Sequence, residues 1–271
     1  MLAAATVHFP YMTAWPERAS PEHQSATTAG FEQLGQAFAD AGIETIIVLT
    51  SEHIVNLQPR LASPFLIGVG DSHAAYPEPQ FKLAPITWRG DPELAEQLVL
   101  ELYGLGFDPA HSIELRLDHG TTLPLARMAI GSNVAIVPII INSLFPPLPT
   151  LKRCGELGAA IAAALGRSTL GRRVGILATG GLSHTVGAPG MERNHPEFDA
   201  AFLAALAGAD LAKACSHPDL LLDALGNGTH EIRNWVAVAG AVHPRRPQVI
   251  TSIPFAPGWD TGVHQLLWTA P

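Results

Sequence analysis

The sequence predicts an α/β fold with a mixed, largely parallel central sheet flanked by helices. Apolar, β-branched runs alternate along the chain with stretches of helical length, which is the pattern of parallel or mixed sheets. Hydrophobic residues make up 47% of the 271 residues and charged residues 15%, which is typical of globular proteins with a large core. Histidines follow several strand-like runs, so we expect the active site at the C-terminal ends of the strands.

The first half of the chain predicts three strands and two helices. Phe31, Leu34 and Phe38 recur at helical spacing before a stop signal at Gly42. The β-branched run that follows suits a strand covered on both faces, as in parallel sheets. In chain order we expect a strand within 1–10, a helix over 27–42, a strand over 43–50, a short strand over 64–70 and a helix over 91–106.

The second half repeats the alternation of strand and helix. We expect a strand over 134–141, a proline-rich loop over 142–150, a helix over 154–166, a strand over 172–181, a helical region over 195–225 and a final helix from near Thr229. The region 195–225 is a candidate helical cap over the site. The length suits one large domain, and we expect residues 1–271 to form a single catalytic domain.

Composition limits the classes of partner and the compartment. The formal net charge is −8, so the chain lacks the basic footprint of proteins that bind nucleic acid or anionic membranes. Two cysteines are too few for a disulfide framework or a thiolate zinc site, which favours a reducing cytoplasm. The N-terminus has no secretion signal, and no apolar run approaches the roughly 20 residues of a membrane helix. We therefore expect a soluble cytoplasmic protein.

Two histidines follow the first two predicted strands, His8 in TVHFP and His53 in VLTSEH. Two such imidazoles can converge on one metal ion, and a carboxylate would complete the two-histidine, one-carboxylate face of non-haem Fe(II) sites. Glu231 in THEIRNW is the best candidate, because it lies in the first turn of a predicted helix near a glycine-containing loop. The alternative is that Glu231 only stabilises the helix N-terminus. His230 is the rival ligand, but it faces another side of the helix.

A second pair of histidines ends strand-like runs, His119 in LDHGTT and His184 in GGLSH. Imidazoles have an ordinary pKa of about 6.5, so this pair is a candidate acid and base. The alternative is that each is a buried, hydrogen-bonded structural histidine. Asp118 need not orient His119, because neighbours in an extended segment point to opposite faces. Solvated surface is expected for the other histidines: His23, His73, His111, His195, His217, His243 and His264.

Other catalytic signatures are missing. The segment GVGDSH lacks the third glycine of a dinucleotide-binding loop, and the chain has no GxxxxGK[ST] phosphate loop. It also has no GxSxG nucleophile elbow and no HExxH zinc motif. Nucleotide-driven chemistry is therefore not expected.

Five motifs, taken in order, resemble those of a known superfamily. They are PFLIGVG, DHGTTLPL, VPIIIN followed by PPLP, GGLSH and THEIRNWVA. With them the chain resembles the class III extradiol ring-cleavage dioxygenases, the superfamily of the protocatechuate 4,5-dioxygenase catalytic subunit, and most of all its 2,3-dihydroxyphenylpropionate 1,2-dioxygenase branch. The resemblance covers nearly the whole chain.

The resemblance implies a reaction and a role for each candidate residue. His8, His53 and Glu231 would bind Fe(II), with Mn(II) as an alternative, and His119 and His184 would be the acid/base pair. A catechol, or an aminophenol, would bind the metal together with the co-substrate O2. The ring would then open beside, not between, its two hydroxyl groups, and both oxygen atoms would be incorporated into the product. We further expect a homo-oligomer, with a small partner subunit as an open alternative.

Two other functions stay open on the same residues. Two histidines and a glutamate can equally hold Zn²⁺ with a bound water, as in zinc-dependent hydrolases. A non-catalytic metal-binding interaction protein on the same scaffold is the second rival. The presence of both a metal face and an acid/base pair argues against it.

Overall fold

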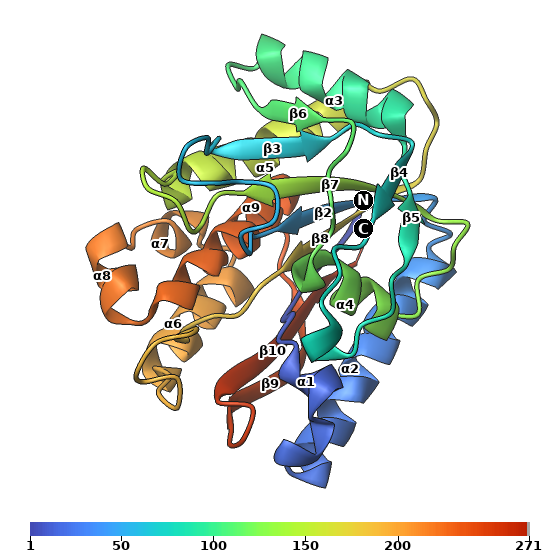
Figure 1. The fold of residues 1–271 in the computed structure, drawn as a ribbon. Coiled ribbons are helices and arrows are strands. Elements are labelled where there is room, and N and C mark those ends of the chain that lie inside the picture. The colour runs from blue at the N-terminus through green and yellow to red at the C-terminus, as the bar shows by residue number, and fades with distance from the viewer. Residues whose placement is uncertain (270–271) are drawn as a thin grey trace.

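A mixed sheet of eight strands forms the centre of the computed structural model, which describes residues 1–269 (Figure 1). Its strands lie in the order β6-β3-β7-β2-β8-β1-β10-β9. In chain order they are β1 (Leu2–Thr6), β2 (Thr45–Thr50), β3 (Phe65–Gly68), β6 (Ala110–Ser112), β7 (Ala135–Ile141), β8 (Val174–Thr179), β9 (Gln248–Ala256) and β10 (Thr261–Trp268). A second, two-stranded sheet pairs β4 (Ser72–Ala74) with β5 (Thr87–Arg89).

Helices cover the central sheet on both faces (Figure 1). They are α1 (Tyr11–Ala14), α2 (Pro21–Asp40), α3 (Pro92–Gly104), α4 (His119–Arg127), α5 (Leu151–Arg167), α6 (Pro196–Ala207), α7 (Leu211–Ala214), α8 (Asp219–Ala224) and α9 (Ile232–Val242). Three short 3₁₀ helices are Pro16–Arg18, Pro79–Phe81 and Asn227–Glu231.

The four strands at the middle of the sheet run parallel. Strand β8 pairs in parallel with both β1 and β2, and β2 pairs in parallel with β7. Strand β3 joins β7 antiparallel and pairs in parallel with β6, and β10 joins both β1 and β9 antiparallel. The mixed, largely parallel sheet expected from the sequence is therefore confirmed, and β1, β2 and β8 end at one edge, where Thr6 lies opposite Thr179.

Alternation along the central strands sends side chains into two cores. Ile46 and Val48 of β2 pack with Phe31 on the side of α2, whereas Ile47 and Leu49 belong to the core under α3, α5 and α9. A strand buried on both faces needs a nearly continuous apolar run. That is why this strand could be recognised in the sequence.

The last two strands, β9 and β10, were not predicted. Strand β10 is buried along its whole length, including His264 and Gln265. The expectation that His264 is a solvated loop residue is therefore wrong, because it lies on β10 and is only 2% exposed. The same expectation is wrong for His73, which is 1% exposed on β4.

The region 195–225 is helical, as expected, and consists of α6, α7 and α8. Helix α6 packs against β9 and α7, and α8 packs against the 3₁₀ helix Asn227–Glu231. Figure 1 shows these helices beside the carboxyl edge of the sheet. Over residues 1–269, no helix has the length and apolar character needed to cross a membrane.

Candidate active site

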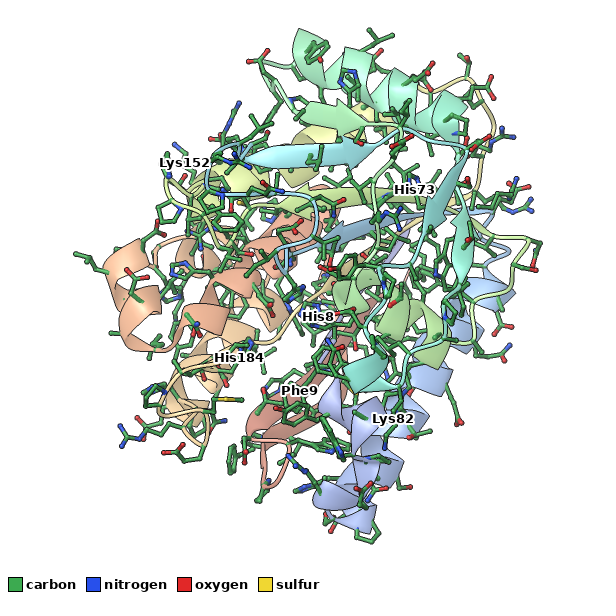
Figure 2. The ribbon with its side chains drawn as sticks, viewed as in Figure 1. His8, Phe9, His73, Lys82, Lys152 and His184 are labelled. Carbon is green, nitrogen blue, oxygen red and sulfur yellow. The ribbon has the colours of Figure 1, made fainter. Side chains whose placement is uncertain are left out.

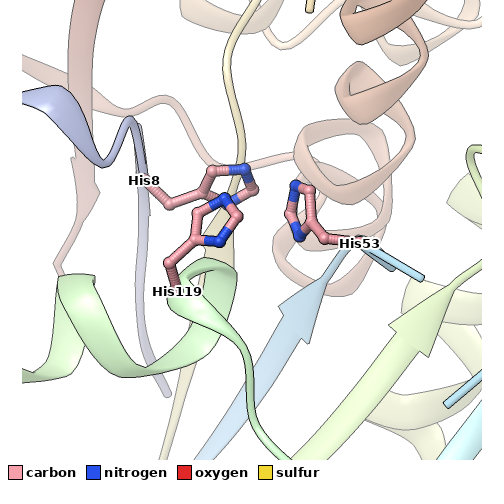
Figure 3. A group of neighbouring side chains, drawn as sticks. All are labelled: His8, His53 and His119. Carbon is pink, nitrogen blue, oxygen red and sulfur yellow. The ribbon is translucent and has the colours of Figure 1, made fainter. Parts of the chain in front are cut away.

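Four histidines and one glutamate converge at the carboxyl edge of the central strands. His8 follows β1, His53 follows β2, and His184 lies in the loop after β8. His119 is the first residue of α4, and Glu231 ends the 3₁₀ helix before α9. Figure 2 shows His8 and His184 near the middle of the molecule, and Figure 3 shows the rings of His8, His53 and His119 side by side.

The carboxylate of Glu231 lies between two imidazoles. Its Oε1 is 3.1 Å from Nε2 of His8 and 3.3 Å from Nε2 of His53. Its Oε2 accepts a hydrogen bond from the Gly181 N–H (2.6 Å) and lies 3.8 Å from Nε2 of His184. The Glu231 side chain is 7% exposed and that of His8 is 5% exposed. One buried carboxylate therefore contacts three of the four histidines.

The other ring nitrogens of His8 and His53 are held by partners behind them. Nδ1 of His8 is 3.2 Å from Oγ1 of Thr179, and Nδ1 of His53 is 2.9 Å from Oδ2 of Asp118. A carboxylate that accepts the Nδ1–H of a histidine fixes its tautomer and leaves the Nε2 lone pair free for a metal ion. Asp118 also accepts a hydrogen bond from the backbone N–H of His53 (3.2 Å), so it positions both the imidazole ring and the backbone of this residue.

The charges of these groups depend on one another. Burial alone would raise the pKa of Glu231, but His8 and His53 hold it well below its usual range. Burial opposes the charged form of His53, yet Asp118 and Glu231 raise the pKa of this imidazole well above its usual value. Asp118 is buried, but the His53 charge lowers its pKa to about 2. Both carboxylates are therefore ionised at neutral pH.

His119 lies beside both His53 and His8. Its ring centroid is 4.2 Å from that of His53 and 5.6 Å from that of His8. Glu78 accepts the His119 backbone N–H (2.6 Å), and Glu78 Oε1 is 2.8 Å from Nδ1 of the ring. Burial and the His53 charge lower the pKa of His119. This favours a neutral imidazole whose Nε2 is left for a ligand.

His184 is held by its own loop. Its Nδ1 is 2.9 Å from the carbonyl oxygen of Leu182, to which an Nδ1–H can donate, so Nε2 faces Glu231. A side chain on either Gly181 or Gly228 would overlap the ring, because a Cβ there would lie 2.7 Å and 2.2 Å from its nearest atom. The two glycines therefore shape the space that the ring occupies.

The donor set fits a divalent metal ion. Ligand atoms that bind one ion at about 2.0–2.2 Å lie roughly 3.0–3.5 Å apart when they are neighbours around it. The two contacts of Glu231 Oε1 fall in this range. Nitrogen and oxygen ligands of this kind suit Fe(II), Mn(II) and Zn²⁺ alike. His8, His53 and His119 form a second candidate grouping, with ligand atoms all within 4.8 Å of one another.

The structure brings all five residues chosen from the sequence together, and one expectation changes. His119 does not end a strand: the LDHG segment turns into α4, and Asp118 caps this helix by accepting the Gly120 N–H (2.8 Å). His230 lies away from the cluster, with Nε2 2.7 Å from Asp223 and Nδ1 2.6 Å from Arg233.

The acids that hold the rings were missed by sequence reasoning. Asp118 is next to His119 in the chain but bonds to His53, as the opposite-face argument allowed. Glu78 lies 41 residues from His119 and in no recognisable motif. One local signal could have found Asp118: it directly precedes the segment HGTTLPL, and Asp is a preferred N-cap residue.

Fold and site together define a mixed α/β protein with a histidine and carboxylate cluster of metal-binding type at the carboxyl edge of its sheet. The family model described as the catalytic LigB subunit of aromatic ring-opening dioxygenase matches residues 2–257, and the chain belongs to this family.

Relatives with curated names are similar to this chain at modest identity. One is a 2,3-dihydroxyphenylpropionate/2,3-dihydroxicinnamic acid 1,2-dioxygenase of Photorhabdus laumondii, 32% identical over 202 residues, or 73% of this chain and 61% of the relative. The match thus spans about three fifths of that relative's length. Another is 2,3-dihydroxyphenylpropionate/2,3-dihydroxicinnamic acid 1,2-dioxygenase 1 of Dechloromonas aromatica. It is 29% identical over 251 residues, or 75% of this chain and 78% of the relative.

A solved structure is similar over the whole chain. It is the crystal structure of the uncharacterized protein JW3007 from Escherichia coli K12, with a TM-score of 0.60 and 15% sequence identity. The alignment covers 99% of each chain. At this identity the similarity concerns the fold alone.

Proposed function

We propose that this protein is a non-haem Fe(II)-dependent extradiol dioxygenase, which cleaves a catechol-type ring and inserts both atoms of O2. One observation carries the proposal: a single oxygen of Glu231 lies 3.1 Å and 3.3 Å from the Nε2 atoms of His8 and His53. Two further imidazoles stand beside this group. Membership of the ring-opening dioxygenase family supports the same reaction.

The ligands of the proposed metal are His8, His53 and Glu231, with Fe(II) as the ion and Mn(II) as an alternative. When bound, the ion would lower the pKa of substrate hydroxyls and hold the two reactants together. Asp118 keeps the Nε2 of His53 free for it. On this assignment His119 is not a ligand, although it lies close to both histidines.

The remaining two imidazoles are the proposed acid/base pair. His184 carries a free Nε2 next to Glu231 and can accept a proton from a substrate hydroxyl. His119, with Nδ1 held by Glu78, can give or take a proton at Nε2. Positioned acid/base groups contribute about 10²- to 10⁴-fold to rates.

The proposed substrate is a small catechol, with an aminophenol as the alternative. Relatives are named for 2,3-dihydroxyphenylpropionate and 2,3-dihydroxicinnamic acid, which supports a dihydroxylated ring. We propose one catalytic domain with its site near α6 and α8. Cytoplasmic location, homo-oligomerisation and a small partner subunit stay predictions.

The experiment separates metal ligands from proton-transfer residues. In His53→Ala, bound iron and oxygen uptake should be lost together, because one of the three metal ligands is removed. In His184→Ala and His119→Ala, bound iron should persist while turnover falls by about 10²- to 10⁴-fold. Iron content and oxygen consumption are measured on the same anaerobically reconstituted samples.

Two results would contradict this assignment. Full activity with bound iron in His53→Ala would remove that residue as a ligand, and iron loss in His119→Ala would favour the three-histidine grouping. Tightly bound zinc with ester or amide hydrolysis and no oxygen uptake would replace the dioxygenase by a hydrolase.

A further inference from the structure

Hydrogen bonds hold the loop that carries His184 at two places. On one side, the Gly228 N–H donates to the carbonyl oxygen of His184 (3.1 Å), and Asn227 exchanges hydrogen bonds with the backbone of Val186 (2.7 and 2.9 Å). Gly228 and Asn227 belong to the 3₁₀ helix that ends at Glu231. These contacts join the loop to the element that carries the carboxylate.

At the second place, the loop is hydrogen-bonded to a buried carboxylate on α6. Asp199 Oδ1 accepts the Ser183 N–H (2.8 Å), and Asp199 Oδ2 accepts the Ser183 hydroxyl (2.9 Å). Ser183 Oγ in turn accepts the His195 N–H (2.8 Å), which closes the base of the loop 184–195. Asp199 and Ser183 are each 1% exposed. Both oxygens of a buried acid therefore bind the residue directly before His184.

A buried carboxylate is a costly way to hold a loop. Desolvation disfavours its charge, and burial raises the pKa of Asp199 to about 6 although the two bonds from Ser183 lower it. The nearby His264 offers no compensating charge, because burial lowers the pKa of its imidazole to about 4. A neutral side chain would fill this position at lower cost, so two directed acceptors are the feature that only the acid provides.

We propose that Asp199 is a positioning residue for His184, acting through Ser183. Asp199 and Ser183 hold the backbone just before His184, and the Gly228 N–H holds the carbonyl group of His184 itself. Together these contacts set the 3.8 Å distance from His184 Nε2 to Glu231 Oε2. Proton transfer depends steeply on such placement, since about 1 Å of displacement can cost on the order of 10²-fold in rate. The inference rests on the proposed acid/base role of His184.

The test changes one partner at a time in the hydrogen bonds between Asp199 and Ser183. Asp199→Asn keeps the shape of the side chain but turns one acceptor into a donor that faces the Ser183 hydroxyl. Ser183→Ala removes that hydroxyl and leaves the backbone N–H, and it serves as the second variant if Asp199→Asn does not fold. Asp210→Asn is the matched control: this exposed acid caps α7 by accepting the Lys213 N–H (3.0 Å).

The expected result is a split between turnover and binding. Oxygen uptake per bound iron should fall about 10-fold or more in Asp199→Asn, and less in Ser183→Ala. Iron content and KM should stay within about two-fold, because the ligands and the substrate contacts on the metal are unchanged. Asp210→Asn should turn over like the wild type. If bound iron falls, KM rises and turnover falls together in both variants, Asp199 has a merely structural role and the proposal is overturned.

A crystal structure of the folded variant gives a readout that needs no substrate. The proposal expects the His184 ring displaced relative to Glu231, whereas an unmoved ring overturns it. If the wild type consumes no oxygen, the proposed function fails, but the position of the ring still decides this inference.

Discussion

Gly228 faces Nε2 of His184, the nitrogen of the proposed acid/base role. A methyl group at this position would lie 2.2 Å from the ring Nε2, which is closer than two non-bonded atoms can approach. The ring is the end of a side chain and can swing away, whereas the backbone of Gly228 is held to the loop of His184. An added methyl would therefore displace the imidazole before it disturbs the fold.

Gly228→Ala is accordingly expected to lower turnover about 10- to 100-fold with bound iron unchanged and little change in the unfolding temperature. The comparison is with Gly104→Ala in α3, where a Cβ meets nothing within 4 Å. Both variants are assayed for oxygen uptake and thermal unfolding. Unchanged turnover in Gly228→Ala would mean that the ring position is not limiting.

At this scale the sequence predicted the side chains that converge at the site but not the groups that orient them. His8, His53 and His184 could be chosen because each follows a recognisable strand. Glu78 and Asp199 could not, because they act through contacts across 41 and 16 residues, which no local pattern encodes.

Helices α5 and α9 pack closely against each other a short distance along the chain from Glu231. Helix α9 begins directly after Glu231, and its Ala237 carbonyl oxygen would lie 1.8 Å from a Cβ at Gly158 of α5. The close contact depends on glycine at this position. A side chain there would push the two helices apart.

Matched glycine substitutions in α5 should have opposite effects. Gly158→Ala is expected to cost about 1–3 kcal/mol of unfolding free energy by overpacking. Gly166→Ala, where a Cβ meets nothing within 4 Å, should gain about 0.4–1 kcal/mol because the unfolded chain loses freedom. Denaturant unfolding measures both, and equal effects would contradict the close-packing argument.

Elements were predictable where periodicity was clean. Strands β2 and β7 are rich in β-branched residues, and α3 begins with a capping Asp91. Strands β9 and β10 were missed because polar residues interrupt them: Gln265 is buried but bonds to Thr6 Oγ1 across the sheet (3.3 Å). Such tertiary pairing hides a buried strand from a hydrophobicity pattern.

Two buried groups should contribute opposite pH dependences to the stability of the whole molecule. Burial raises the pKa of Asp199 from 3.8 to about 6 and lowers that of His264 from 6.5 to about 4. As pH falls from 6 towards 4, the folded state takes up a proton on Asp199 that the unfolded state does not, which stabilises it. Over the same range the unfolded state protonates His264 first, which destabilises the fold.

Asp199→Asn removes the carboxyl group whose protonation stabilises the folded state as pH falls. Relative to the wild type, the variant should therefore lose stability as pH falls from 7 to 4, by up to about 1.4 kcal/mol per pH unit. Denaturant unfolding at pH 7, 5.5 and 4 gives the difference. Parallel pH profiles of the two proteins would show that Asp199 does not titrate in this range.

The central claim concerns the reaction of the whole molecule, and oxygen consumption tests it most directly. Protein reconstituted anaerobically with Fe(II) is mixed with a panel of catechols and aminophenols while oxygen uptake and the coloured ring-opened product are followed together. The account predicts one O2 consumed per extradiol product with at least one of these compounds, and loss of this activity in His53→Ala. No uptake with any of them, despite bound iron, would contradict it.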